Sequence, residues 1–290
     1  MDGVIIVDKP AEWTSHDVVG KMRRLAQTKR VGHLGTLDPM ATGVLPLVLN
    51  RATRLAQFYT KADKVYEATI RFGFATNSYD ADGEATTEAV AVSLDAAALN
   101  RALDAFRGDI LQVPPAVSAK KINGVPAYKL ARQSKPVVLD PVPVTIHELE
   151  LLDCGADTAR VRVHCSTGTY IRSLAHDLGV ALGCGAHLSA LRRTRAGQFT
   201  LAEARTLAEL ADPAVLEAAL IPASALLPEF PAERVDEVTA GFIRQGRDFR
   251  VNPFRVRQGA PYVRAVDGGG ALVAIGEIRL PNLYHPFLVL

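Results

Sequence analysis

The stretch from Val31 to Gly43, VGHLGTLDPMATG, constrains this chain more than any other. It holds three glycines and one proline, and its apolar residues follow neither the helical period nor the alternation of a strand. Such a composition predicts an ordered loop. Asp38 lies in this loop directly before Pro39, whose ring disfavours a helical backbone at the preceding residue. The sequence therefore predicts a carboxylate carried on a rigid loop.

The residues of the loop leave the role of Asp38 open. A carboxylate fixed in this way can act as a nucleophile, as a general base or as a metal ligand. By itself, an aspartate ahead of a proline is more often a turn-forming residue. No second Asp, Glu or His stands at ligand spacing around it, so a metal site is a poor fit.

Regular elements are expected on both sides of the loop. Residues 4–7 form a short apolar run that indicates a strand, and Ser15 is suited to cap a helix with apolar residues at helical spacing. Residues 65–72 alternate between two faces, which predicts a half-buried strand. Tyr66 begins the inward-facing row of that strand.

The middle of the chain predicts two further helices and two further strands. Residues 95–106 favour a helix, because Asp95 lies at its start and Gly108 follows its end. Residues 142–152 and 159–165 indicate strands, and a helix is expected from about residue 170.

Prolines at positions 222, 228 and 231 mark a linker. A chain of 290 residues exceeds the usual size of one domain, which agrees with a division at this point. We expect an α+β protein with a large domain over residues 1–231 and a small, mainly β domain over residues 232–290.

Composition indicates a soluble cytoplasmic protein that needs no disulfide or metal. Hydrophobic residues make up 48% of the chain, which is enough for a sizeable core. The three cysteines form no CxxC pair, so a disulfide framework or a zinc site is not expected. The first residues do not resemble a signal peptide, and no apolar run is long enough for a membrane span.

Basic residues gather in four clusters, although the net charge is only +2. The acidic residues concentrate elsewhere, for example around Asp80. Four separate basic clusters favour an extended polyanion as the partner over four unrelated solvated surfaces. One of them falls in a proline-containing stretch that predicts a long basic loop at about residues 114–135. The clusters lie at residues 21–33, 120–135, 192–195 and 241–264.

Seven segments of the first 200 residues together resemble one known family. The run RVGHLGTLDPMATGVLPL resembles the catalytic loop of the TruB family of pseudouridine synthases. The match continues in the family's order with DKP, KVYEATIRFG, NSYDADGE, PPAVSAKKINGVPAYKLAR, CSTGTYIRSLAHDLG and CGAHLSALRRTRAG. One departure is Thr76-Asn77-Ser78, where the family often has Thr-Asp-Thr, and it leaves Asp80 as the carboxylate of that segment.

The resemblance implies a fold and a reaction. The family has a central mixed, mostly antiparallel sheet flanked by helices, and a small C-terminal PUA-like β domain. Its members detach uracil from the ribose of a uridine, rotate the base and rejoin it through C5, without a cofactor. By resemblance, Asp38 is the nucleophile, Arg172 keeps it ionised and Tyr66 stacks on the uracil as the favoured base. Attack on ribose C1′ and attack on uracil C6 are both compatible with these residues.

Other positions acquire roles through the same resemblance. Tyr170 is similar to a substrate-contacting tyrosine and Leu191 to a leucine of the pocket wall. Lys9 is similar to a lysine that supports the loop, although an ordinary surface lysine is nearly as good a reading. His33 matches the histidine that fills the stack when the target base is flipped out.

Phosphate contacts are expected from the basic loop and from the cluster that follows Leu191. Lys120 and Lys121 belong to the loop, and Arg192 and Arg193 to the cluster. RNA of this kind is recognised by shape, by phosphate contacts and by splayed bases.

Three functions remain open at this point. The first is a stand-alone, monomeric enzyme that acts on uridine 55 in the T-arm of tRNA without an obligate protein partner. The second is a guide-dependent synthase that acts on rRNA within a ribonucleoprotein. The third is an RNA chaperone without catalysis. The short C-terminal domain and the lack of lysine-rich tails favour the first, and the set of Asp38, Tyr66 and Arg172 disfavours the third.

Overall fold

The computed structural model describes residues 1–116, 121–122, 125–126, 139–254, 256 and 259–290. Within these residues, ten strands form one mixed sheet in the order β12-β1-β3-β10-β4-β9-β8-β5, with β2 added beside β3 and β11 beside β10. The strands of this sheet are β1 (Gly3–Lys9), β2 (Val31–His33), β3 (Thr42–Leu49), β4 (Lys64–Phe72), β5 (Gly108–Gln112), β8 (Val142–Cys154), β9 (Thr158–Cys165), β10 (Ala186–Ala196), β11 (Phe199–Thr200) and β12 (Ile221–Pro222). A two-stranded pair consists of β6 (Lys121–Ile122) and β7 (Val125–Pro126).

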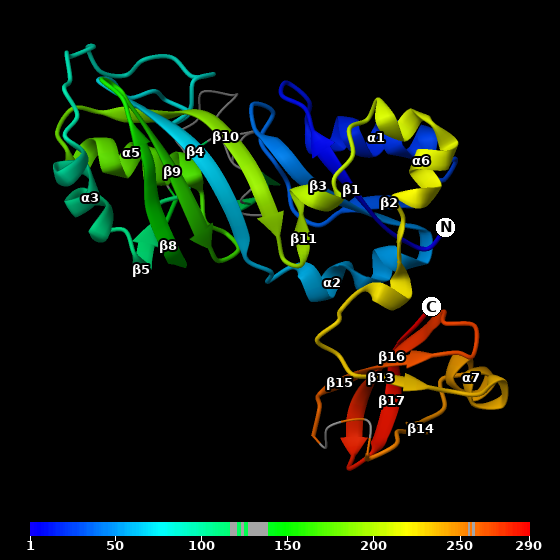
Figure 1. Ribbon diagram of the computed structural model, residues 1–290. Helices are drawn as coiled ribbons and strands as arrows, with labels where there is room; N and C mark the ends of the chain where they lie inside the picture. The colour runs from blue at the N-terminus through cyan, green and yellow to red at the C-terminus, as the bar shows by residue number, and fades with distance from the viewer. Residues whose placement is uncertain (117–120, 123–124, 127–138, 255, 257–258) are drawn as a thin grey trace.

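The large sheet has two halves that meet where β3 lies beside β10 (Figure 1). This contact is the one parallel pairing among the described strands of the sheet, and it is short: Thr42 lies opposite Arg192, and Gly43 opposite Arg193. The remaining strand pairs of the sheet are antiparallel. The expected mixed, mostly antiparallel sheet is therefore confirmed.

The strands alternate as the sequence predicts. In β4 the side chains of Tyr66, Ala68, Ile70 and Phe72 are buried, and those between them are half-buried or exposed. This row packs against the helices of one face of the sheet in a core that also contains Leu174. Burial of such rows supplies the main force that holds the helices on the sheet.

Helices flank the sheet, and most of the described helices are short. They are α1 (Ser15–Leu25), α2 (Ala56–Tyr59), α3 (Ala96–Asp104), α5 (Ile171–Ala181), α6 (Pro213–Ala218) and α7 (Glu237–Arg244), with 3₁₀ turns η1 (Asn50–Leu55), η2 (Leu201–Glu203), η3 (Glu209–Ala211) and η4 (Ala223–Ala225). The expected cap of α1 is wrong by one residue. Thr14 is the N-cap, and a capping box with Asp17 satisfies the first turn. Because Thr14 caps the helix, the Ser15 side chain can hydrogen-bond to Leu37 instead.

The end of the chain forms a second, five-stranded sheet in the order β13-β15-β16-β17-β14, drawn in orange and red below the large sheet in Figure 1. Its strands are β13 (Ala232–Arg234), β14 (Phe249–Arg250), β15 (Tyr262–Val266), β16 (Leu272–Leu280) and β17 (Leu283–Val289). It has its own core, while Leu272, Ile275 and Leu288 pack against residues of the large sheet. The protein is thus α+β with a small C-terminal β region, as expected. No helix of the described residues is long and apolar enough to cross a membrane.

Candidate active site

The predicted catalytic loop joins β2 to β3, and buried side chains hold its backbone. Ser15 Oγ accepts a hydrogen bond from the Leu37 amide at 2.8 Å and donates one to the Leu37 carbonyl at 3.1 Å. Lys9 Nζ donates to the carbonyl of Pro39 at 3.0 Å. Because these anchors lie on both sides of Asp38, the loop presents this residue from a fixed backbone.

Asp38 forms a bidentate ion pair with Arg172, which lies in the first turn of α5. Arg172 Nε is 2.9 Å from Asp38 Oδ2, and Nη2 donates to Oδ1 at 3.1 Å. The Arg172 side chain is only 5% exposed, whereas that of Asp38 is 35% exposed. The guanidinium therefore approaches from inside the protein and leaves the carboxylate accessible to a ligand.

Asp80 lies on the other side of the same guanidinium. Its Oδ2 is 3.4 Å from Arg172 Nη1, and its Oδ1 accepts a hydrogen bond from Ser78 Oγ at 2.5 Å. Asp80 is buried, so it does not compete with Asp38 for a ligand. Its position identifies it as a carboxylate that orients Arg172.

The surroundings of Asp38 raise its pKa above the ordinary value for an aspartate. Burial is the largest cause, because a charged carboxylate loses hydration in the pocket. The charge of Arg172 lowers the pKa, Asp80 raises it, and Lys9 lowers it again. The net direction is upward, so the two cations limit a shift that burial would otherwise make larger.

Six of the residues that the sequence singled out, Arg193 among them, line one cavity of about 280 Å³. Asp38 and Arg172 lie together with Tyr66, Tyr170 and Leu191 in its wall. Burial raises the pKa of the Tyr66 hydroxyl, and the charge of Arg193 opposes this shift. The cavity thus combines an ionic pair with aromatic and aliphatic walls, which suits a planar polar ring.

Gln112 was not found from the sequence, yet it fixes Tyr170. It is buried at the end of β5, where its Oε1 accepts from the Tyr170 amide at 2.7 Å and its Nε2 donates to the Tyr170 carbonyl at 3.0 Å. Tyr170 is the N-cap residue of α5, so this pair sets the start of the helix that carries Arg172. A single Gln between apolar residues gives no sequence signal for such a role.

Lys9 is fully buried and lies beneath the loop. Besides Pro39, its ammonium reaches the carbonyls of Pro10 at 2.8 Å and Trp13 at 2.5 Å. Burial lowers its pKa to about 8, while the charge of Asp38 acts in the opposite direction. A lysine without exposed surface does not fit a direct RNA contact, and the loop-supporting reading fits its position.

His33 ends β2, at the start of the loop and outside the cavity wall. It is half-buried, and its Nδ1 accepts a hydrogen bond from the Gly35 amide at 3.3 Å. Burial lowers its pKa, and the charges of Arg193 and His16 add to the effect. The lowered pKa favours the neutral form of the ring at pH 7.

The two neighbouring arginines of β10 have different surroundings. Arg192 is 40% exposed and forms an ion pair with Asp8 at 2.7 Å, so it lies at the surface. Arg193 has no exposed surface, and its guanidinium faces the backbone of the loop. The expected phosphate contact of Arg193 therefore does not fit its burial. Lys120 and the side chain of Lys121 lie outside the described residues.

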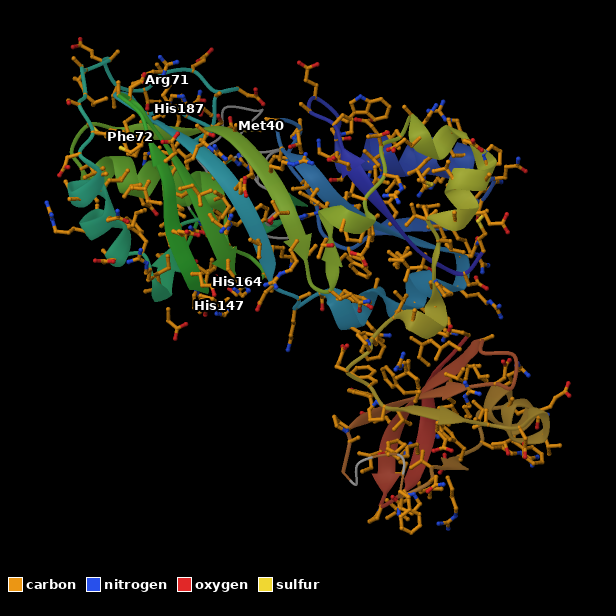
Figure 2. The ribbon with its side chains drawn as sticks, viewed as in Figure 1. Met40, Arg71, Phe72, His147, His164 and His187 are labelled. Atoms are coloured by element: carbon orange, nitrogen blue, oxygen red, sulfur yellow. The ribbon has the colours of Figure 1, made fainter. Side chains whose placement is uncertain are left out.

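A second polar cluster escaped the sequence prediction because its members come from separate segments: two strands and the residue before β4. His147 and His164 lie close together on β8 and β9 in Figure 2, and their Nε2 atoms are 3.3 and 3.7 Å from Asp63 Oδ2. These three residues could hold a metal ion. However, Arg195 lies 3.0 Å from His164 Nε2, so a cation occupies one of the ligand positions. The arrangement favours a polar cluster over a metal site.

Two family models match the chain. The N-terminal domain of TruB family pseudouridylate synthases matches residues 23–171, and the tRNA pseudouridylate synthase B C-terminal domain matches residues 172–228. The chain is 59% identical over 293 residues to the tRNA pseudouridine synthase B of Solibacter usitatus (strain Ellin6076), an alignment that covers 100% of both proteins. It is 48% identical over 261 residues to the enzyme of the same name from Thermobifida fusca (strain YX), with 87% of each covered.

Solved structures show the same fold. A chain of an H/ACA RNP bound to a substrate RNA containing 2′-deoxyuridine is 25% identical with a TM-score of 0.72, over 98% of this chain and 83% of that one. A chain of a Cbf5-Nop10-Gar1 complex is 26% identical with a TM-score of 0.72, over 98% of this chain and 83% of that one.

Proposed function

This chain belongs to the TruB family of pseudouridylate synthases, and from that premise we propose that it isomerises uridine 55 in the T loop of tRNA to pseudouridine. The chain is an enzyme of tRNA pseudouridine synthesis, as its relatives named tRNA pseudouridine synthase B are. The position of the uridine and the roles of individual residues are the finer part of the proposal. The geometry of the cavity supports them.

The observation that carries the proposal is the carboxylate of Asp38, held by Arg172 at the wall of a cavity that also contains the Tyr66 ring. The isomerisation breaks the C1′–N1 bond and forms a C1′–C5 bond. C5 then loses its proton and N1 gains one, so atoms balance without a redox partner. The reaction therefore needs a nucleophile, a base and a place in which the detached ring can turn, and no cofactor.

Asp38 is the nucleophile in this proposal, which requires the ionised form. Because burial raises its pKa, the guanidinium of Arg172 is the group that keeps it charged near pH 7. Asp80 holds Arg172 from behind and keeps its two nitrogens aimed at Asp38. The three side chains act as one unit in which only Asp38 meets the substrate.

Tyr66 stacks on the uracil, and its phenolate form, which the charge of Arg193 favours, receives the proton that leaves C5. It projects from β4 into the cavity, where Leu191 supplies an apolar wall. An aromatic ring with a polar tip suits both contacts, because the ring face binds the base and the hydroxyl meets its edge. Tyr170, fixed by Gln112, contacts the substrate from the start of α5.

The target base must leave its stack before Asp38 can reach it, at a cost of a few kcal/mol. We assign the replacement of the base to His33, because it is a neutral ring at the start of the catalytic loop. His33 and Asp38 are five positions apart in the same loop. The loop therefore connects the residue that replaces the base to the nucleophile that attacks it.

Binding of the T-arm requires phosphate contacts around the cavity. Arg192 is at the surface beside it, and the basic loop with Lys120 and Lys121 follows β5 in sequence. The region that begins at Ala232 carries arginines such as Arg244, at the end of α7, and Arg250 in β14. We propose that residues 232–290 form a PUA-like RNA-binding domain beside a catalytic domain of residues 1–231.

A stand-alone tRNA enzyme is preferred over a guide-dependent rRNA enzyme. The relatives that align with the whole chain are named as tRNA enzymes. The structural neighbours that are named as parts of ribonucleoproteins or protein complexes are 25–26% identical. A non-catalytic chaperone would have no need of the Asp38–Arg172 pair.

The decisive test uses the purified protein alone with an unmodified tRNA transcript tritiated at uracil C5. We expect tritium release by the wild type and none by Asp38→Asn, with the affinity for tRNA retained. A tritiated transcript in which uridine 55 is replaced by cytidine should release no tritium, because the target uridine is missing. Absence of release by the wild type from both the tRNA and an isolated T-arm would contradict the proposal.

A further inference from the structure

Arg193 is the bulkiest side chain without solvent exposure among the described residues. It lies on β10, directly opposite Tyr66 of β4 in the strand register, and both residues line the cavity. It is also opposite Gly43 of β3 in the parallel pairing. Arg193 therefore lies where the catalytic loop, the Tyr66 strand and the junction of the two half-sheets meet.

The guanidinium joins the two ends of the catalytic loop. Its Nη2 donates to the carbonyl of Gly35 at 3.0 Å and its Nη1 to that of Thr36 at 3.3 Å, both before Asp38. Its Nε donates to the carbonyl of Val44 at 2.7 Å, after Asp38. A loop that is tied at both ends by one rigid, planar group has little freedom to shift its middle.

The same residue also lies beside Tyr66, and both line the cavity. An arginine has five N–H donors, of which three are used by the loop carbonyls. Arg193 and Tyr66 are register partners on adjacent strands, and after burial the charge of Arg193 is the largest influence on the pKa of the Tyr66 hydroxyl, which it lowers. Arg193 thus spans the gap between the loop that carries the nucleophile and the ring that stacks on the base.

The charge of Arg193 has no carboxylate partner among the ion pairs of the described residues. A buried charge that serves only to fill space is costly, and an apolar side chain would fill the same volume better. Three neutral carbonyls of the catalytic loop compensate the buried charge, which ties the arginine to that loop. After burial, Arg193 is the next influence on the pKa of both Tyr66 and Lys64, which line the cavity.

We propose that Arg193 is a positioning residue of the reaction: it locks the catalytic loop and holds the Tyr66 hydroxyl at a fixed place relative to Asp38. It also supplies the fixed positive charge beside the oxygen that receives the C5 proton. The loop lock is a property of the fold, whereas the effect on proton transfer rests on the proposed function.

The test compares the wild type with Arg193→Lys and Arg193→Met, using Arg162→Met as a control. Arg162 is a partly exposed arginine of β9 in the same sheet that pairs with Glu150 and Glu67, away from the cavity. Hydrogen exchange of residues 31–44 measures the loop lock without any reaction. We expect faster exchange of this segment in both Arg193 variants, most in Arg193→Met, and wild-type exchange in the control.

Single-turnover kinetics measure the effect on the reaction, with tRNA carrying hydrogen or deuterium at C5 of the target uridine. A displacement of the reacting groups by about 1 Å costs on the order of 100-fold, so we expect a loss of that size in Arg193→Met with tRNA affinity within about threefold of wild type. Arg193→Lys keeps the charge and should recover part of the rate. The isotope effect should be larger in Arg193→Met, because proton removal becomes slow.

Each outcome tests a separate part of the proposal. Unchanged exchange of residues 31–44 in Arg193→Lys, which retains the charge and most of the volume, would overturn the loop lock. A rate loss with an unchanged isotope effect would overturn the link to Tyr66. A loss confined to tRNA affinity would return Arg193 to RNA binding. If the wild type shows no isomerisation, the proposed function fails, while the exchange result still decides the loop lock.

Discussion

Replacement of Arg172 by Met should move the low-pH side of the activity profile upward. Asp38 is active only when ionised, so the turnover rate rises with pH as this carboxyl loses its proton. In the wild type the pKa of Asp38 is already above its ordinary value, and Arg172 is the largest influence that lowers it. Removal of this cation leaves burial and Asp80 acting in the same direction, so the pKa rises further.

The size of the shift follows from the ion-pair geometry. Two unit charges about 4 Å apart interact by about 4 kcal/mol at the effective dielectric constant of a protein surface. Asp38 and Arg172 are in direct contact, but the Asp38 side chain is 35% exposed and solvent screens part of the interaction. Half of that energy, about 2 kcal/mol, corresponds to about 1.5 pH units. The acid limb should move upward by that amount.

The assay is the single-turnover rate at saturating enzyme from pH 5 to pH 9, with thermal unfolding followed at each pH (the range is set at about two units on either side of neutrality). Arg172→Lys is the matched control: it keeps the charge but cannot contact both oxygens of Asp38, so its rate falls while its acid limb stays near that of the wild type. An acid limb that is the same in Arg172→Met and wild type would refute the assignment of Asp38 as the titrating nucleophile.

Three further substitutions test two supports of the loop, Lys9 and Ser15, and the proposed role of His33. Lys9→Met should remove a pH dependence of stability. The folded-state pKa of Lys9 is lowered from 10.5 to about 8, so the unfolded chain binds the extra proton between these values. The wild type should therefore gain stability relative to Lys9→Met as the pH rises from 8 to 10.5, by at most about 3 kcal/mol, in urea unfolding. Ser15→Ala leaves the buried amide and carbonyl of Leu37 without this partner and should lower the free energy of unfolding by about 1–3 kcal/mol in the same assay. His33→Ala should lower the single-turnover rate more than tRNA affinity, and an unchanged rate would exclude it from base replacement.

Much of the site could be predicted because its residues lie in short, unusual segments. The loop around Asp38 could be predicted from its glycines and proline, although it is shorter than expected: Val31–His33 and Thr42–Gly43 belong to β2 and β3. The strand with Tyr66 could be found because one face is buried and the other is not, which imposes a period of two. Arg172 could be placed only through the family resemblance, because its motif has no physical signature of its own.

The supports of the site could not be predicted, because burial of a charged side chain is decided by tertiary contacts. Lys9 and Arg193 have the residue types of a surface, and both are fully buried. A signal for Arg193 did exist. Adjacent residues of a strand face opposite sides, so only one of Arg192 and Arg193 can share the face of Leu191, and that one must point into the cavity wall.

Gly43 shows how closely the loop and the sheet depend on each other. It ends the glycine-containing stretch that predicted the loop, and its φ of +100° is unfavourable for other residues. The structure gives a further reason for glycine here. A Cβ atom at this position would lie 2.2 Å from the Arg193 carbonyl, inside the parallel pairing of β3 with β10. The glycine that closes the catalytic loop therefore also permits the strand contact that carries Arg193 beneath it, so the position of Asp38 and the junction of the half-sheets are determined by the same few residues.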